Sequence, residues 1–482
     1  MHWCLVIKTI GLLVFFLGLT MLLPLAVCLA YGDACTLSVE MAIGVTLVAG
    51  LGLYIPCRNT GQNAISSRDA MAIVTLGWAV VGLFGALPFI LSGEFGPLVD
   101  SVFESISGFT TTGASILTDI ESVSMGLLFW RSFIQWLGGM GIIVLSIAIL
   151  PFIGVGGMQL YKAEVPSPVP DKLKPRIRDT AKILWKVYVL ITAIEIVLLM
   201  FGNMTFFDAV CHALTTLPTG GFSTKNASID SFNSAYIDGV LIIFMLLAGI
   251  NFSLHYQLLR GKPLAFWKDS ECRFFLGMVA ILVFIVTLNI YGTVYATVGE
   301  SLRYGAFQIA SIVTTTGFAT ADYEQWPALS QLILLLCMVV GASAGSTGGG
   351  VKCLRVMLCL KYCYRELIKL IHPHAVKHIK INKEPVPEGV VRSVMGFLAL
   401  YIVIFAVSTL LLAGTGVDFI TSIGAVAASI GNIGPGFGMV GPVENYALIP
   451  EMGKWLLIGC MLVGRLEIFT IIILIVPEFW RS

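Results

Sequence analysis

Apolar runs long enough to cross a bilayer dominate the chain. A helix needs about 20 apolar residues to span the ~30 Å hydrocarbon core. Ten candidate spans lie near residues 10–30, 38–56, 70–92, 124–153, 180–202, 236–259, 273–292, 328–360, 389–413 and 452–476. The first run is too long for the apolar part of a signal peptide and has no clear small-residue cleavage site. The pattern therefore predicts an all-α integral membrane protein.

Four further apolar stretches are too short to cross a membrane. They lie near residues 99–111, 206–217, 301–314 and 418–431, and each runs into glycine-rich or threonine-rich sequence that ends a helix. The segments Phe103–Gly113 and Phe307–Gly317 share their spacing and a closing Thr-Thr-Thr-Gly. The segment Phe207–Phe222 is a second copy, and Asp418–Gly436 is the most divergent.

The spacing of these copies leaves room for one helix before and one helix after each turn. We therefore predict two N-terminal spans followed by four helix–pore-loop–helix repeats around a pseudo-fourfold pore. The predicted units are 1–60 for the leading spans, then 68–160, 178–262, 268–366 (with a broken second helix) and 388–482 for the repeats.

The repeated turns suggest a chemistry. Irregular backbone at membrane depth is tolerated only where it is buried in protein or lines a watery cavity. Four turns that face the same way satisfy this condition together if they surround one axis. Their carbonyls would then replace the water around a cation, and the half-helix C-termini would add partial negative charge. One such turn alone is typical of an extracellular loop, whereas four at regular spacing favour a pore.

Composition and charge narrow the class of protein. The chain is 57% hydrophobic and 12% charged, which excludes an ordinary cytosolic enzyme. A net charge of +1 gives no basic field for nucleic acid. If the N-terminus is inside, inner loops and inner ends hold 24 of the 29 Lys and Arg residues. This asymmetry predicts cytoplasmic N- and C-termini; the family resemblance described below implies a bacterial inner membrane.

Ten small residues interrupt the run 328–360. Residues 341–350 include five glycines, Gly341, Gly345, Gly348, Gly349 and Gly350, so a continuous helix is not expected there. We predict a flexible loop that obstructs the pore below the turns. A phosphate-binding loop is disfavoured, because Val351 stands where that motif requires lysine and no strand precedes it. Close helix contact would explain only a few of the glycines.

Arg465 stands near the middle of the last predicted span. A cation there is costly and is functional by default. Glu467 is only two positions away and lies on a different helix face, so it is a poor partner. Our hypothesis is that Arg465 donates to carbonyls of the small-residue loop and repels cations in the closed state. The alternative is a side chain that snorkels to the inner surface.

The 11 cysteines add little at this stage. They are odd in number, contain no CxxC pair and sit mostly inside apolar runs. Such cysteines usually act as small hydrophobic residues, and we favour that interpretation over a disulfide or metal framework.

The turn sequences resemble a known family. Thr110–Gly113, Gly220–Thr224, Thr314–Gly317 and Asn432–Gly436 resemble the four filter segments of the Trk/Ktr/HKT superfamily of potassium transporters. Four further motifs resemble the TrkH-type branch of this superfamily in particular: Gly138–Val144, Gly156–Tyr161, Ala344–Gly350 and Gly464–Glu467. The resemblance covers nearly the whole chain.

This resemblance implies a potassium-translocating subunit without a cofactor of its own. It implies a homodimer that docks a cytoplasmic nucleotide-binding regulatory subunit of the TrkA type. The ion site would use backbone oxygens around Thr111, Thr112, Gly113, Thr219, Gly220, Gly221, Thr315, Thr316, Gly317, Asn432, Ile433 and Gly434. In this family, a glycine in all four repeats goes with preference for potassium over sodium, and the arginine lies under the filter. Pro218 and the absence of threonine in the fourth filter depart from the pattern.

Two other classes of membrane protein fit the sequence less well. An intramembrane enzyme needs paired carboxylates, a histidine cluster or a Ser/Lys pair within spans, yet Glu195 and Arg465 are far apart in the sequence. An inverted-repeat carrier predicts broken helices in two matching halves rather than a fourfold, same-facing repeat. Passive gated conduction and proton-coupled symport both fit the sequence.

Overall fold

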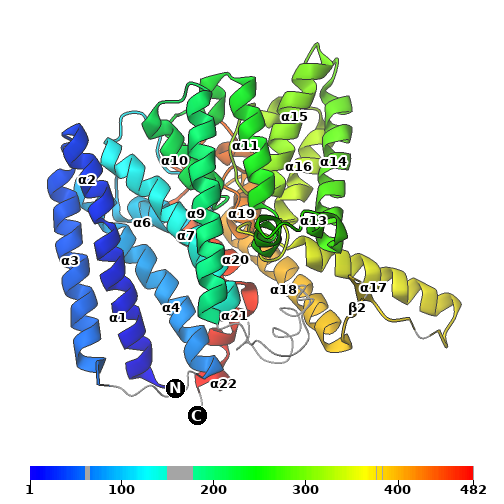
Figure 1. Ribbon diagram of the computed structural model, residues 1–482, viewed down its shortest axis with the longest axis horizontal. Coiled ribbons are helices and arrows are strands. Elements are labelled where there is room, and N and C mark those ends of the chain that lie inside the picture. The colour runs from blue at the N-terminus through cyan, green and yellow to red at the C-terminus, as the bar shows by residue number, and fades with distance from the viewer. Residues whose placement is uncertain (60–65, 149–176, 376, 383, 481–482) are drawn as a thin grey trace.

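A computed structural model describes residues 1–59, 66–148, 177–375, 377–382 and 384–480. Helices form nearly all of its regular structure (Figure 1). Within these ranges, the only strands are β1 (Lys380–Ile381) and β2 (Glu384–Pro385), an antiparallel pair with Ile381 opposite Glu384. Both chain ends lie at the same end of the molecule (Figure 1).

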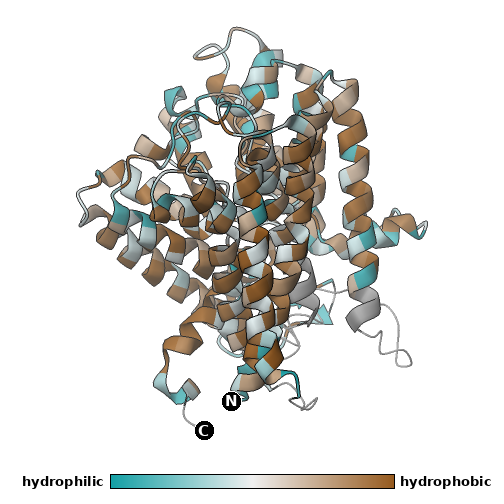
Figure 2. Cartoon of the chain, turned by 90° about the vertical axis from the view of Figure 1, so that its left-hand side faces the viewer, coloured by the Kyte–Doolittle hydropathy of each residue, from teal (hydrophilic) through white to brown (hydrophobic). Residues whose placement is uncertain are grey.

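The long apolar helices match the predicted spans closely. They are α4 (Ser67–Gly85), continued by α5 (Leu87–Ser92), α7 (Met125–Ala148), α9 (Ile177–Phe201), α14 (Ser270–Ile290) and α18 (Glu388–Ala413). In the described part of the chain, six helical runs are long and apolar enough to cross a membrane, or up to eight if two bent pairs each count as one span. Hydrophobic residues run along the lengths of the helices (Figure 2), as expected for surfaces that face lipid.

Two leading spans pack along one edge of the molecule (Figure 1). The first consists of α1 (Trp3–Thr20) and α2 (Leu22–Tyr31), and the second of α3 (Thr36–Tyr54) with the short η1 (Ile55–Cys57). Glycines let α1 and α3 approach closely, because an ideal Cβ on Gly50 would lie only 2.6 Å from the Phe15 nitrogen.

Four short helices occupy the predicted non-crossing stretches. They are α6 (Leu98–Phe109), α10 (Phe206–Thr216), α15 (Val298–Val313) and α19 (Phe419–Gly431). Most of their residues are buried, with the entire second half of each helix enclosed by protein. Hydroxyl or carboxylate side chains cap the N-termini of three of them, namely Thr205, Thr297 and Asp418.

The predicted break in the run 328–360 is present. Helix α16 (Ala328–Val339) ends before the small-residue loop, and α17 (Cys353–Ile371) begins after it and projects away from the helical body (Figure 1). The remaining short elements are η3 (Ser228–Phe232), α13 (Ala265–Lys268), η4 (Tyr323–Gln325), η5 (Gly438–Val440) and α22 (Pro477–Trp480).

Two of the predicted spans are bent within the run that was predicted to cross the membrane. The run 236–259 divides into α11 (Ala235–Ala248) and α12 (Phe252–Leu259), bent by 103°. The run 452–476 divides into α20 (Glu451–Arg465) and α21 (Ile468–Ile475), bent by 118°. The breaks come from caps and backbone conformation rather than from hydropathy. The Asn251 side chain accepts a hydrogen bond from the Ser253 N–H at 2.9 Å to start α12, and Glu467 adopts a φ of 59°.

Some expectations lie outside the described residues. These are the end of the span predicted over 124–153, the Gly156–Tyr161 motif, the boundary of the leading unit at 60, that of the first repeat at 160, and the basic residues of 162–176. The division of the chain into repeat units stays a prediction.

The α1–α3 contact gives a matched test of packing. Gly50→Leu should destabilise the protein by about 1–3 kcal/mol, because its side chain must push the α1 backbone away. Gly52→Leu is the control, since nothing lies within 4 Å of an ideal Cβ at that position. Thermal unfolding of the purified protein in detergent measures the difference. Equal melting temperatures for the two variants would contradict the close approach of the helices.

Candidate functional site

Each of the four short helices ends in the same backbone turn. The first residue of every turn has a positive φ, as does the glycine two residues later. We name them turn 1 (Thr111–Gly113), turn 2 (Thr219–Gly221), turn 3 (Thr315–Gly317) and turn 4 (Asn432–Gly434). In each, the N–H of the middle residue donates to a carbonyl five residues earlier, at 2.8 Å in turns 1 to 3 and 2.9 Å in turn 4. This is the Schellman type of helix ending.

Strain at the first position distinguishes these turns from ordinary helix ends. Glycine usually occupies the left-handed position of a Schellman turn. Here Thr111, Thr219 and Thr315 hold it with φ between 52° and 61°, a conformation that is unfavourable for a β-branched residue. Asn432 fills the same position in turn 4 with a φ of 54°, which asparagine tolerates better. Strained residues of this kind concentrate at functional sites.

The four turns meet around one axis. An ideal Cβ on the glycine of turn 1 would lie 1.9 Å from the middle carbonyl oxygen of turn 2. The equivalent distances are 1.9 Å from turn 2 to turn 3 and 1.8 Å from turn 3 to turn 4. The ring closes from turn 4 to turn 1 at 2.9 Å. All twelve residues expected at the ion site thus lie in one ring, and no side chain fits at its glycine positions.

Hydrogen bonds between the segments that follow the turns close a second ring above the first. Turn 1 is joined to turn 2 by the Ile120 N–H, which donates to the Asn226 side chain at 2.6 Å, and turn 2 to turn 3 by the Ile229 N–H, which donates to the Ala319 carbonyl at 3.1 Å. Turn 3 is joined to turn 4 by the Gly438 N–H, which donates to the Glu324 carboxylate at 2.6 Å. Turn 4 is joined to turn 1 by the Tyr446 N–H, which donates to the Ser115 carbonyl at 2.8 Å. This linkage fixes the positions of the four turns.

A cavity of about 90 Å³ opens onto the ring from this side. Its lining includes the glycines of all four turns, Arg131, Lys225 and Glu444. The volume is enough for several water molecules. Two carboxyl groups in the loops on this side of the ring have shifted pKa values. A hydrogen bond from the Asn226 side chain lowers the pKa of Asp119, whereas burial raises the pKa of Glu324.

Sequence reasoning missed the side chains that brace the turns. Three polar residues stand nine positions before the last glycine of turns 1 to 3, namely Glu104, His212 and Gln308. Glu104 accepts from the Ile116 N–H at 2.9 Å, His212 contacts the Ser223 hydroxyl at 3.0 Å, and Gln308 lies against the backbone of Thr320 and Ala321. Their matching offsets were the available signal. In the fourth repeat, the Tyr446 hydroxyl instead donates to the Gly434 carbonyl at 2.7 Å.

Two side chains of α7 join turns 1 and 2 from behind. Arg131 pairs with the buried Glu104 carboxylate and donates to the Ser223 carbonyl at 2.8 Å. Its guanidinium also lies 3.7 Å from the centre of the Phe222 ring. One helical turn later, the Gln135 amide donates to the Gly220 carbonyl at 2.8 Å. Nothing in the repeat pattern predicted either residue.

The small-residue loop lies against the opposite side of the ring. The Gly349 N–H donates to the Thr315 hydroxyl at 2.7 Å, and the Thr347 hydroxyl donates to the Leu217 carbonyl at 2.8 Å. An ideal Cβ on Gly349 would lie 2.4 Å from the Gly431 carbonyl oxygen. The loop therefore contacts the inner ends of turns 2, 3 and 4, and only very small residues fit beneath them.

Arg465 reaches the same loop from the end of α20. One guanidinium nitrogen donates to the Thr347 carbonyl at 2.7 Å, and another lies 3.5 Å from the Gly138 carbonyl oxygen. The side chain is only 3% exposed, so the snorkelling alternative is wrong. Glu467 pairs with Arg355 and not with Arg465, as predicted, but it lies in the break between α20 and α21 rather than on another face of the same helix.

Glu271 at the start of α14 fastens both ends of the loop. One of its carboxylate oxygens accepts from the Ala344 N–H at 2.7 Å and from the Leu354 N–H at 3.1 Å. The second bond falls in the first turn of α17, where a helix favours negative charge. The loop is thus held at its ends by Glu271 and at its middle by Arg465.

The buried pair behind turns 1 and 2 should be worth several kcal/mol. Arg131→Ala leaves the Glu104 carboxylate buried without its charge partner, which should cost about 3–5 kcal/mol of stability. Lys225→Ala is the control, because its ion pair with Glu121 is long, at 4.0 Å, and partly solvated, worth about 0–1 kcal/mol. Thermal unfolding in detergent compares them. A loss for Arg131→Ala no larger than that for Lys225→Ala would contradict the bracing role.

Known proteins share this sequence and this arrangement. The TrkH family, described as a cation transport protein, matches residues 39–482. The Trk system potassium uptake proteins TrkH of Salmonella typhimurium and of Escherichia coli K12 are both 43% identical over the full length of both chains. The potassium transporter TrkH from Vibrio parahaemolyticus has a crystal structure that superposes with a TM-score of 0.92, at 38% identity and full coverage of both chains. The chain therefore belongs to the TrkH family of cation transport proteins.

Proposed function

We propose that this chain takes up potassium across the membrane through the ring formed by the four turns. The proposal depends on one observation: the last glycine of each turn lies against the middle carbonyl oxygen of the next turn, so the four turns form a closed ring. Relatives that match the whole chain are named potassium uptake proteins, which supports potassium as the cation.

Main-chain oxygens perform the selection in this proposal. The carbonyls of the four turns replace the hydration shell of the ion, and the C-terminal ends of α6, α10, α15 and α19 add partial negative charge. The rings of hydrogen bonds hold these oxygens in place before the ion arrives, so little reorganisation is needed. The ion is cargo, and the chain requires no cofactor.

Side-chain oxygens supplement the carbonyls. The Thr111 hydroxyl is buried and has no hydrogen-bond partner, so it is available on the inner side of the ring. In turn 4, Asn432 replaces threonine. Its amide nitrogen donates to the Thr112 hydroxyl at 2.9 Å and to the Met461 carbonyl at 3.0 Å, which leaves its buried oxygen without a partner. The divergent fourth turn therefore offers an amide oxygen where its counterpart offers a hydroxyl.

The small-residue loop and Arg465 form the gate. The loop contacts the inner ends of three turns, and a buried guanidinium beneath the ring opposes the passage of a cation. Opening requires the loop to leave Thr315 and Leu217, and the left-handed glycines Gly345 and Gly350 give its backbone that freedom. Gly341 packs against the Gly349 carbonyl, so these two ends of the loop move together.

The proposal extends to the orientation of the chain in the membrane, its oligomeric state and its regulatory partner. The N- and C-termini face the cytoplasm of a bacterial inner membrane, and the protein works as a homodimer. A cytoplasmic nucleotide-binding subunit of the TrkA type regulates it by shifting the loop. Support for an inner basic face comes from the excess of Lys and Arg in the loops on that side. Passive conduction and coupling to protons remain alternatives that a reversal potential distinguishes.

An intramembrane enzyme is disfavoured. Glu195 is buried on α9 with neither carboxylate oxygen hydrogen-bonded, and in the described residues no ion pair joins it to Arg465. The two clearest ionisable groups within the spans therefore do not form a catalytic pair. A carrier with two matching halves is disfavoured by the four-membered ring.

Adding a side chain to one turn tests the filter. Gly317→Ala places a methyl group against the Ile433 carbonyl and strains a φ of 84°, so rubidium uptake by proteoliposomes should fall at least about tenfold. Gly299→Ala on the same pore helix is the control, because its ideal Cβ meets nothing within 4 Å. Unchanged uptake and unchanged competition by sodium in Gly317→Ala, at normal expression, would refute the filter.

Neutralising the arginine tests the gate. Arg465→Ala should raise rubidium flux in proteoliposomes that lack any regulatory partner, because both the contact with Thr347 and the positive charge are lost. Arg465→Gln separates these two effects, since it removes the charge but keeps a hydrogen-bond donor. If repulsion dominates, both variants conduct more; if the contact dominates, only alanine does. Unchanged or lower flux in both variants, with normal expression, would count against the gate.

A further inference from the structure

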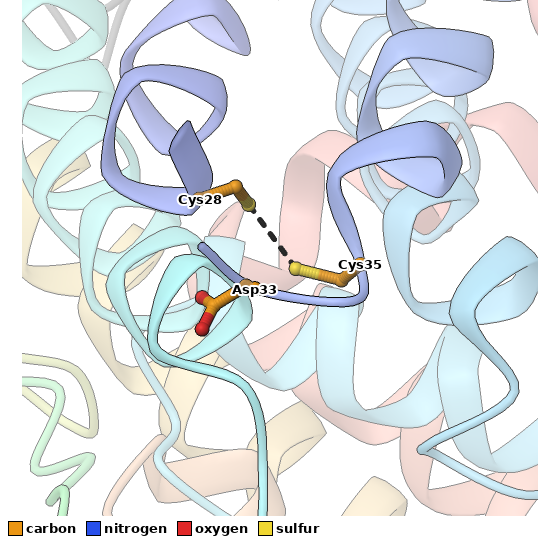
Figure 3. Close-up of side chains that lie close together, drawn as sticks. All are labelled: Cys28, Asp33 and Cys35. Atoms are coloured by element: carbon orange, nitrogen blue, oxygen red, sulfur yellow. Dashed lines mark hydrogen bonds between the residues drawn. The ribbon is translucent and has the colours of Figure 1, made fainter. Parts of the chain in front are cut away.

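Two cysteines face each other where the chain reverses between the first two spans. Cys28 lies in the last turn of α2, and Cys35 immediately precedes α3. Gly32, with a φ of 70°, ends α2 and lets the chain turn back. Both thiols are buried, and their sulfurs lie 3.1 Å apart and point toward each other (Figure 3). The interpretation of the cysteines as isolated hydrophobic residues does not cover this pair.

The start of α7 encloses the pair. An ideal Cβ on Gly126 would lie 2.1 Å from the Cys28 sulfur, so the glycine is needed to admit the thiol. The Gly126 N–H also donates to the Asp33 carboxylate at 2.8 Å. The hairpin is thus pinned to α7 on both sides of the sulfurs, with each sulfur directed at the other.

A metal ion is the first alternative for this cluster. The two sulfurs and a carboxylate oxygen of Asp33 lie within 4.8 Å of one another. In Figure 3, however, the Asp33 carboxylate points away from the sulfur pair. Tetrahedral zinc with 2.3 Å bonds holds two thiolates about 3.8 Å apart. The observed separation of 3.1 Å is shorter and favours direct bonding between the sulfurs.

The location determines the redox environment. The hairpin contacts residues 124–126, and Ser124 in turn donates to the Glu94 carboxylate at 2.6 Å, close to the start of α6. This is the face of the cavity above the ring. With the orientation given under the proposed function, on which this inference rests, that face meets the oxidising periplasm.

We propose that Cys28 and Cys35 form a disulfide bond that staples α2 to α3 on the outer face. It forms by thiol–disulfide exchange with a dithiol–disulfide protein of that compartment. One S–S bond forms in this chain and one breaks in the donor. The two thiols lose two electrons and two protons, and the donor disulfide takes them up to become a dithiol. The bond lowers the conformational entropy of the unfolded hairpin, and in the folded chain it fixes the contact of the hairpin with α7.

Peptide mass spectrometry tests the bond. The full chain is purified without reductant, denatured, and treated with N-ethylmaleimide before digestion. The peptide containing Cys28 and Cys35 should carry no maleimide and be two hydrogens lighter than its reduced form, whereas prior reduction should add two labels. Reduction should also lower the melting temperature of the native chain but not that of Cys28→Ser. Cys337→Ser, which alters a buried thiol within a span, should leave both results unchanged.

Three outcomes decide the matter. Two maleimides on the peptide without reduction would overturn the disulfide. Stoichiometric zinc in the purified protein, lost in Cys28→Ser, would overturn it in favour of a metal site. Labelling of Ser231→Cys, an exposed position near the cavity rim, by an impermeant maleimide in spheroplasts tests the orientation separately. If Ser231→Cys is labelled in spheroplasts while Cys28 and Cys35 are free thiols, the disulfide is refuted and the orientation is not. If Ser231→Cys is labelled only after permeabilisation, the orientation is refuted.

Discussion

Unsatisfied main-chain carbonyls at membrane depth are the constraint on which this structure depends. A helix that stops inside the bilayer must direct its last carbonyls to a partner, and a single interrupted helix has none. Four interrupted helices solve the problem together by pointing their ends at a shared axis. The glycines allow neighbouring turns to touch, and a threonine or an asparagine holds the left-handed position at the start of each turn. The surrounding spans separate these helix ends from lipid, as irregular backbone inside a membrane requires.

Symmetry in the ring contrasts with asymmetry beneath it. All four turns have the same backbone form, yet the loop between α16 and α17 lies under three of them. Arg465 reaches that loop from the end of α20, and Glu271 ties it to the first turn of α17 from the start of α14. In the proposed function, the ring selects the ion and the loop beneath it forms the gate, so the two tasks belong to different parts of one pathway.

The sequence predicted the elements well and their lateral contacts poorly. Glycine and threonine spacing located the four segments, and the resemblance to the filter segments of the Trk/Ktr/HKT superfamily supplied the individual residues of each turn. Hydropathy could not reveal the bends at Asn251 and Glu467, since the flanking residues are apolar on both sides. Gln135 and Glu271 contact distant segments, and no local pattern encodes such partners. Cys28 and Cys35 are only seven residues apart, but their approach depends on the reversal of the chain at Gly32. Glu104, His212 and Gln308 were within reach, because they share an offset from the last glycine of their turn.

The central claim is that main-chain oxygens of the four turns encircle a dehydrated monovalent cation. Anomalous diffraction from crystals grown with rubidium locates such an ion directly. The account predicts a peak on the axis, bounded by main-chain oxygens of the four turns, that disappears when sodium replaces rubidium. A peak away from this ring, or an axis without bound rubidium at saturating concentration, would contradict it.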